Sequence, residues 1–331
     1  RGIRVEVDTR DAEREEAIVR GDFSLLRRAV INLLTNAIKY GAANSRVSVS
    51  LSAEGTDWVI RVRDQGEGMA ADALPSARPL RRPIAGGLDV DDSFDAIAYE
   101  KGGALLAMFE RQLGAERLRA GVRGYIATHA GGNASAADFL AALAAAAEPE
   151  VAAAFASFLD HPGVPEVAVT LTCAAGADAT VAATVTSARG DAPWTLPICV
   201  RFPDRGATWG ERCAWLPPGG GAVTVPGCPA WITVNPDGAG YYRVAYAPAL
   251  DAALRRHLRD LAVADRFTRA ADLAAEVRAG RAEVATLFSW IGSLVATGDR
   301  HDLLAAVGLA NLLATHVAPA DRPRDAAIER A

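Results

Sequence analysis

The hydrophobic periodicity of the chain changes three times along its length, so a single repeating architecture is excluded. Residues 1–69 mix helix-like and strand-like patterns. Helices are predicted at 94–113, 115–129 and 135–147, and the alanine-rich run 141–154 favours helix by propensity. Residues 167–246 carry short β-branched runs separated by Gly and Pro, and 250–317 are helix-like again, with one helix predicted at 258–279. With 331 residues, of which 50% are hydrophobic, the chain can bury several cores. We therefore expect a mixed fold of two to four domains.

The charge balance excludes several classes of partner. The 35 Lys and Arg residues are scattered among 40 Asp and Glu residues, which gives a net charge of -5. Such a chain offers no basic surface for nucleic acid or for an anionic membrane. No run of apolar residues is long enough to span a bilayer. The start at Arg1 shows neither an initiator Met nor a signal peptide and is typical of the middle of a longer product. Neither the compartment nor the oligomeric state can be predicted.

All four cysteines fall in the strand-rich stretch, and they are Cys173, Cys199, Cys213 and Cys228. Four cysteines allow three pairings, and their spacing contains no CxxC metal knuckle. One or two disulfides in an exported domain and buried reduced thiols both fit this pattern.

The first part of the chain combines a helix with two strands. Apolar residues recur at helical spacing between Phe23 and Tyr40, and Gly41 is suited to end that helix. Residues 46–51 and 58–62 then alternate as strands do. From Ala70 to Asp92 the periodicity disappears among prolines and glycines, which predicts a loop or junction.

Two groups of residues in this part carry chemistry. Asn32, Asn36 and either Lys39 or Tyr40 lie on one edge of the predicted helix. An Asn carbonyl can bind Mg²⁺, and a nearby Lys can meet phosphate oxygens. The stretch Asp64–Met69 follows the second strand, where an Asp can accept a hydrogen bond from an amine and glycines let a ligand approach the backbone. Taken singly, each group also suits a solvated helix or an ordinary turn.

In this order, the two groups resemble the N-box and the first glycine box of the ATP-binding domain of histidine kinases. The resemblance covers about the first 70 residues and implies a partial α/β sandwich. It places Mg²⁺ at Asn36, with Asn32 in support, and it places the phosphates near Lys39. It also places the base beside Tyr40 and the adenine amine on Asp64, with Gly66 and Gly68 in the glycine box.

The expected continuation of that family is missing. Nothing after Met69 resembles its lid or its second glycine box, because Gly86-Gly87-Leu88 is too short. The helix with the phosphoacceptor His is not recognisable either. Phosphoryl transfer requires a positioned triphosphate, so we expect ATP with Mg²⁺ to bind at most, without autokinase activity.

A second resemblance covers about three quarters of the chain, from residue 79 onward. The segment Phe94–Gly102, which contains Ala-Tyr-Glu-Lys-Gly, resembles the part of M1-family zinc aminopeptidases that follows their zinc site. The similarity continues in order along the chain through 105–108, 113–116, 121–129, 133–134, 138–139, 194–199 and 235–244. The resemblance implies the helical lobe of a thermolysin-like domain, then a β-sandwich, then the start of an α-helical domain.

The M1 resemblance implies a catalytic role for Tyr99, whose hydroxyl would support the tetrahedral intermediate beside zinc. By itself, a Tyr on a helix is more often an aromatic with a polar tip. Zinc is the cofactor that this family implies, but no pair of histidines has the HExxH spacing. The five histidines are at 129, 161, 257, 301 and 316. We therefore expect no zinc ligands and no peptide hydrolysis by this chain alone.

The expected organisation is a partial ATPase-like domain (1–70), a junction (71–92), a helical peptidase lobe (93–162), a β-sandwich (163–248) and a helical domain (249–331). Three hypotheses follow: an M1 aminopeptidase-like protein without catalysis, an ATP-binding fragment of a sensor histidine kinase, and an artificial fusion of the two. The expected ligand is a peptide or a nucleotide at most.

Overall fold

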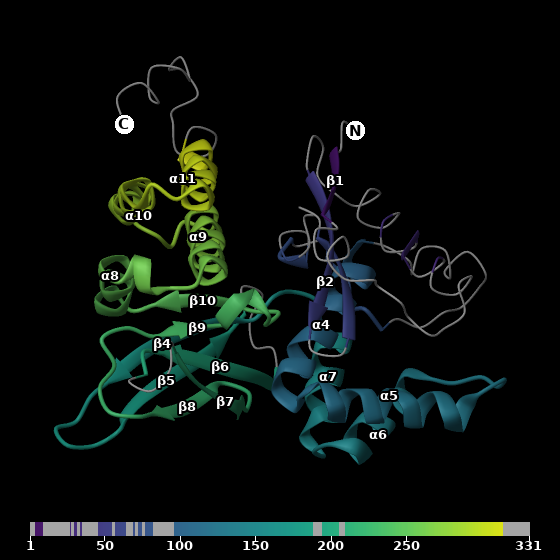
Figure 1. The fold of residues 1–331 in the computed structure, drawn as a ribbon. Coiled ribbons are helices and arrows are strands. Elements are labelled where there is room, and N and C mark those ends of the chain that lie inside the picture. The colour runs from purple at the N-terminus through teal and green to yellow at the C-terminus, as the bar shows by residue number, and fades with distance from the viewer. Residues whose placement is uncertain are drawn as a thin grey trace. The chain divides into compact units, whose positions relative to one another are not determined.

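The computed structural model describes residues 4–8, 27, 30–31, 34, 46–54, 57–63, 69, 72–74, 77–81, 96–187, 194–204 and 209–313. The chain forms two compact units (Figure 1). The first consists of Arg1–Asp72 with Pro83–Gly102, and the second of Ala73–Arg82 with Gly103–Ala331.

The first unit contains a three-stranded sheet in the order β1-β2-β3, formed by β1 (Arg4–Asp8), β2 (Arg46–Glu54) and β3 (Asp57–Arg63). The two strands predicted from alternation, 46–51 and 58–62, are therefore confirmed. β2 and β3 pair antiparallel, whereas β1 runs parallel to β2. A parallel pair needs a crossover connection, and the residues described within it (27, 30, 31 and 34) are helical.

Four helices follow: α4 (Ala96–Leu113), α5 (Ala115–His129), α6 (Ala136–Ala146) and α7 (Glu150–Asp160). Gly114 separates α4 from α5 with a φ of 86°, a conformation that glycine adopts readily. Ser135 and Asp138 form a capping box that starts α6. The Phe109 and Phe155 rings stack 4.6 Å apart and tie α4 to α7.

The helix predicted over 135–147 is confirmed as α6, and the alanine-rich run 141–154 is divided between two helices. α6 ends at Ala146 and α7 begins at Glu150. Pro149 stands between them, and proline has no N–H for the helical ladder and clashes with the preceding turn. The break therefore outweighs the helix propensity of alanine.

The next part, which we call the two-sheet region, contains seven strands. One sheet has the order β10-β4-β5-β8 and the other the order β7-β6-β9. The strands are β4 (Glu166–Thr172), β5 (Ala179–Thr186), β6 (Leu196–Phe202), β7 (Gly210–Leu216), β8 (Gly220–Val225), β9 (Thr233–Val234) and β10 (Arg243–Tyr246). Burial alternates residue by residue along β5, so one face of its sheet is covered. Every residue of the central strand β6 is buried.

Both cysteine pairs in the two-sheet region are disulfides, which answers the question that the sequence left open. Cys173 is bonded to Cys228, and Cys199 is bonded to Cys213. The sequence separations are 55 and 14 residues, and the shorter loop lies inside the longer one. No cysteine is free.

The chain then continues as helices, which Figure 1 shows gathered on one side of the two-sheet region. These are α8 (Pro248–Arg256), the short 3₁₀ helix η2 (Leu258–Asp260), α9 (Val263–Arg278), α10 (Val284–Thr297) and α11 (Arg300–Leu312). The predicted single helix 258–279 is wrong, because Leu261 is extended and separates η2 from α9. Leu258 and Leu261 both lie in one core cluster with Trp290, and the break lets both reach it.

The helical core contains ion pairs as well as apolar side chains. Arg269 on α9 pairs with Asp251 on α8 at 2.9 Å, and both side chains are less than 10% exposed. The indole Nε1 of Trp290 donates to the same carboxylate at 3.0 Å. These bonds compensate for burying the charges. Among the described helices, none is long and apolar enough to cross a membrane.

Candidate functional site

The nucleotide-binding residues predicted from the sequence lie outside the described residues. They are Asn32, Asn36, Lys39, Tyr40, Asp64, Gly66 and Gly68. Their roles, including Mg²⁺ binding by Asn36, stay predictions.

Tyr99 belongs to α4, but its side chain is also outside the described part of the structure. Two residues further on, Lys101 of the same motif is fully buried, and its Nζ lies 3.0 Å from Asp72 Oδ2. A buried ammonium needs such a carboxylate, because it would otherwise lose its hydration without compensation. We identified Lys101 only as a motif residue and missed this pair. The signal available was a Lys between apolar helix positions such as Ile97 and Leu105.

A larger group of charges joins α4 to the two-sheet region. Arg111, at the end of α4, donates to Glu211 on β7, with Nη2 2.7 Å from Oε2 and Nε 3.1 Å from Oε1. It also donates to Asp237 at 3.1 Å. Two bonds to one carboxylate fix the guanidinium in direction as well as in distance.

Arg201, on β6, extends this group toward the helices. Its side chain is 8% exposed, and it donates to Asp237 at 2.7 Å and to Asp265 on α9 at 3.0 Å. Asp265 also accepts hydrogen bonds from the Asp237 N–H at 2.7 Å and from Thr233 at 3.1 Å. We call Arg111, Arg201, Glu211, Asp237 and Asp265 the ionic cluster. It links α4, the two-sheet region and α9.

The two aspartates of the ionic cluster respond differently to burial. Burial works to raise the pKa of Asp237, but hydrogen bonds and charge from Arg201 and Arg111 outweigh it and lower the pKa. The pKa of Asp265 is raised, because its burial outweighs the bond from the Asp237 N–H and the charge of Arg201. Of these two aspartates, Asp237 is therefore the one that the arginines hold ionised more firmly.

A tight turn positions Asp237 for this role. Asn235 and Asp237 have φ values of 63° and 59°, a region that residues other than glycine rarely adopt. The Asn235 side chain accepts from Gly240 N at 2.6 Å and donates to Gly240 O at 3.1 Å. These bonds hold the strained backbone in place. The segment 235–244 is part of the M1 resemblance, and these bonds give its residues Asn235 and Gly240 a structural role.

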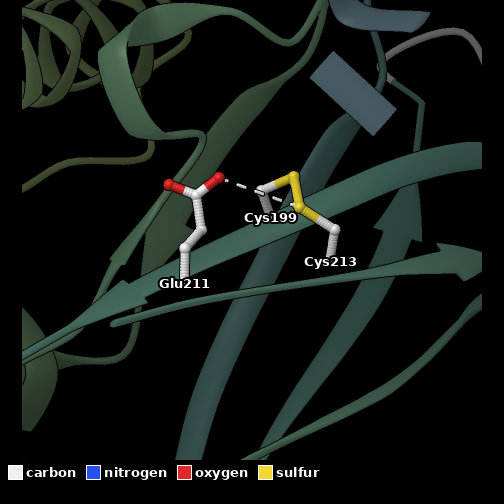
Figure 2. Close-up of side chains that lie close together, drawn as sticks. All are labelled: Cys199, Glu211 and Cys213. Carbon is white, nitrogen blue, oxygen red and sulfur yellow. Dashed lines mark hydrogen bonds between the residues drawn. A yellow bond between two sulfur atoms is a disulfide. The ribbon is translucent and has the colours of Figure 1, made fainter. Parts of the chain in front are cut away.

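Within the described residues, one group has the composition of a metal site. Ligand atoms of Cys199, Glu211 and Cys213 lie within 4.8 Å of one another (Figure 2). The two sulfurs are bonded to each other, however, and Glu211 is paired with Arg111. A disulfide offers no thiolate, and the guanidinium competes with a cation for the carboxylate. These residues do not fit a zinc ion.

The described histidines do not form a metal site either. His161 contacts the Ser157 carbonyl at 2.9 Å, and His257 contacts Asp260 at 2.8 Å. His301, on α11, lies beside Asp299, the residue that precedes this helix. His129, on α5, packs near the Tyr125 ring. Each of the four therefore has local neighbours, and His316 lies outside the described residues.

Comparison with known proteins extends the sequence resemblance. The model of the peptidase family M1 domain matches residues 38–158. The chain is 28% identical over 218 residues to Aminopeptidase M1 of Arabidopsis thaliana, which covers 62% of this chain and 25% of that protein. It is 32% identical over 130 residues to Aminopeptidase N of Lactobacillus helveticus, covering 38% and 15%. The chain is related to M1-family aminopeptidases.

A further match is the Tricorn protease-interacting factor F2 of Thermoplasma acidophilum. It is 24% identical over 221 residues, which covers 67% of this chain and 27% of that protein. The chain thus spans about a quarter of the length of most of these relatives. The M1 match begins at residue 38 and overlaps the region compared above with histidine kinases. Neither the family model nor these relatives support a histidine-kinase domain.

Proposed function

We propose that the chain from about residue 79 onward corresponds to the part of an M1-type aminopeptidase that follows the zinc motif, and that Tyr99 is its transition-state tyrosine. The observation that carries the proposal is the motif 98–102 within α4, followed in order by the matched helices α5 to α7. A phenol there can donate to the oxyanion of a peptide under attack. The two-sheet region would be the β-sandwich, and α8 to α11 the start of the helical domain.

The same proposal assigns no peptide hydrolysis to this chain alone. Zinc in this family activates the attacking water and polarises the carbonyl. The chain has no HExxH sequence, and the described cysteines and histidines do not form a substitute site. The remaining function is structural: the ionic cluster holds α4 to the two-sheet region and α9.

The test is an assay with fluorogenic aminoacyl substrates, run with added Zn²⁺ and again with a chelator. We expect no turnover above the chelated sample and less than one equivalent of tightly bound zinc by elemental analysis. Zinc-dependent turnover that is lost in Tyr99→Phe would support Tyr99 as the transition-state tyrosine. It would also overturn the proposal that the chain alone does not hydrolyse peptides. Turnover that persists in Tyr99→Phe would overturn both.

A second proposal, nucleotide binding by residues 1–70, rests on a separate observation. β1 and β2 are parallel and are joined through residues that include a helical stretch, while β3 pairs antiparallel. The described residues 27, 30, 31 and 34 of this connection are helical, and the proposed site needs an Asn-bearing helix and an Asp-Gly loop that meet at one ligand. Asn36 and Asp64 would then bind Mg²⁺ and the adenine amine.

Calorimetric titration with Mg-ADP tests this second proposal. We expect weak binding in the original chain, a loss of that binding in Asp64→Asn, and no transfer of labelled phosphate from ATP. A matched control is Asp57→Asn, since Asp57 lies at the start of β3 and outside the proposed site. Unchanged affinity in Asp64→Asn, or equal losses in both variants, would contradict nucleotide binding at this place.

The third hypothesis, an artificial join, is tested by peptide mapping of protein from the natural source. Trypsin should release residues 64–81 as one peptide, because Arg78 precedes Pro79 and is not cleaved. Detection of that peptide shows that the junction is part of the natural polypeptide. Recovery of only the flanking peptides shows two separate parents.

A further inference from the structure

The Cys199–Cys213 bridge connects two strands at a point where they are already held together. Cys199 on β6 lies directly opposite Cys213 on β7, and their Cα atoms are 4.1 Å apart. Residues that face each other in a non-hydrogen-bonded antiparallel pair have a similar separation without any cross-link. The strand pairing extends on both sides, from Leu196 opposite Leu216 to Phe202 opposite Gly210. Opening the bridge therefore requires no movement of the strands.

The two residues of this bridge differ in exposure. Cys199 is 6% exposed, whereas Cys213 is exposed to solvent. A disulfide is opened by a thiolate that approaches one sulfur along the bond. Because Cys213 is the exposed residue of the pair, we expect the attacking thiol to become attached to Cys213 and Cys199 to be the leaving group.

The bridge also lies beside the ionic cluster. Cys213 Sγ is 3.9 Å from Glu211 Oε1, as Figure 2 shows, and Glu211 is the carboxylate that Arg111 holds. Arg201 lies 3.5 Å from the same carboxylate. As a disulfide, Cys213 carries no charge. As a thiolate, it would repel Glu211 and compete with it for the guanidinium of Arg111.

We propose that the Cys199–Cys213 bridge is a thiol-exchangeable switch that controls how firmly Arg111 of α4 is held by Glu211 of β7. Its reaction partner is a small thiol. The thiolate of a first molecule attacks Cys213 Sγ, the bridge bond breaks, and Cys199 leaves as a thiolate that takes up a proton. A second thiolate attacks the attached small-molecule sulfur, and Cys213 leaves as a thiolate beside Glu211. Of the two protons that the small thiols give up, one goes to Cys199 and the other to solvent. Two small thiols become one disulfide, and the bridge gains two electrons.

The other bridge is not placed to act in this way. Cys173 and Cys228 are both exposed, but they follow β4 and β8 of the other sheet, where Asp178 Oδ1 accepts from Gly227 N at 3.0 Å. Their reduction would release a loop of 55 residues and would leave the ionic cluster without a new charge. The two bridges therefore provide an internal comparison within one molecule.

The test uses the full chain in glutathione buffers of increasing reducing strength, with acid quenching and peptide mass spectrometry. We expect glutathione on Cys213 before any appears on Cys199, while most of the strand pairing persists. Hydrogen exchange in residues 103–113 should accelerate by about two- to fivefold on reduction, the effect of weakening one partly exposed ion pair. Exchange in α10 should not change.

Two variants keep the outcome interpretable. In Cys173→Ser/Cys228→Ser, the same acceleration should follow reduction of the remaining bridge. In Glu211→Gln, exchange in 103–113 should already be fast, and reduction should add little. Unchanged exchange in 103–113 after mapped reduction of Cys199–Cys213 would overturn the proposal. So would a bridge that stays oxidised until the whole chain unfolds, or glutathione that appears equally on Cys199 and Cys213.

Discussion

At the scale of single residues, Arg201 forms ion pairs with three carboxylates of the ionic cluster, those of Glu211, Asp237 and Asp265. The Asp265 side chain is 1% exposed, whereas that of Asp237 is 42% exposed and keeps its bond from Arg111. In Arg201→Ala, the buried carboxylate of Asp265 loses its compensating charge, so we expect a loss of about 3–5 kcal/mol in the free energy of unfolding. Urea denaturation followed by tryptophan fluorescence measures it.

The matched control for this change is Arg119→Ala. Arg119 pairs with Glu116 one helical turn away, and the two side chains are 42% and 85% exposed. Water screens such a pair, so its loss should cost less than about 1 kcal/mol. Equal losses in the two variants would show that the ionic cluster contributes no more than a surface pair.

Asp272 gives the fold a dependence on pH. Burial raises its pKa to about 7, against the opposing charge of Arg269 and a hydrogen bond from Val244 N at 3.1 Å. A carboxyl whose pKa is raised on folding contributes stability below its unfolded pKa, near 4, and that contribution is lost as the pH rises through about 7. The chain should therefore be more stable at pH 5 than at pH 8 on account of this residue.

Asp272→Asn tests this assignment, since an amide keeps an acceptor for Val244 N–H but does not ionise. We expect a smaller change in unfolding free energy between pH 5 and pH 8 than in the original chain, measured by urea titration at both values. Relative to the original chain, the variant should gain more unfolding free energy at pH 8 than at pH 5. If the variant instead loses stability mainly at pH 8, Asp272 is an ionised partner of Arg269 and the assignment is wrong.

At the scale of helices, two glycines of α5 make a matched pair. A Cβ atom on Gly121 would lie 2.9 Å from Leu143 Cδ2 and 3.2 Å from Leu143 Cα, whereas nothing lies within 4 Å of one on Gly124. Gly121→Ala should therefore force α5 away from α6 and cost about 1–3 kcal/mol. Gly124→Ala should stabilise the helix by about 0.5–1 kcal/mol. In thermal unfolding, the midpoint temperature should fall for Gly121→Ala and rise for Gly124→Ala.

Helix boundaries were predictable where the chain carries its own breaks. The range predicted for α5 matches the structure, because Gly114 adopts a positive φ before it. The end of α6 at Ala146 lies within one residue of the predicted end at Ala147, whereas the alanine propensity of 141–154 by itself gives no sign of the break before α7. The break at Leu261 depends on a core that forms only in the folded chain, so periodicity carried no sign of it.

The candidate sites were harder to predict than the helices. The ionic cluster brings together Arg111, Glu211 and Asp265, which span more than 150 residues of sequence. Local sequence patterns cannot predict such long-range contacts. Lys101 was visible as a charge between apolar positions, but its partner Asp72 was not. The disulfide pairing likewise depends on the register of β6 and β7, which no cysteine spacing determines.

At the scale of the whole molecule, the two disulfides should contribute unequally to stability. Each restricts the unfolded chain, and the restriction grows with the separation of the bonded residues, which is 55 for Cys173–Cys228 and 14 for Cys199–Cys213. Chain entropy predicts losses of about 4 and about 3 kcal/mol when the pairs are replaced by Ser. Urea unfolding of the two double variants compares them, and a larger loss for the shorter loop would contradict this account.

The nesting of these two loops also sets how far the chain can be drawn out under tension. Pulled from its ends, an oxidised molecule cannot extend the 55 residues between Cys173 and Cys228, because the outer covalent bond bears the load. At about 3.6 Å for each extended residue, roughly 200 Å of contour length stays hidden. The inner bond at Cys199 and Cys213 never feels the force while the outer one is intact. Single-molecule stretching should therefore register the inner bond only after the outer one has been opened chemically.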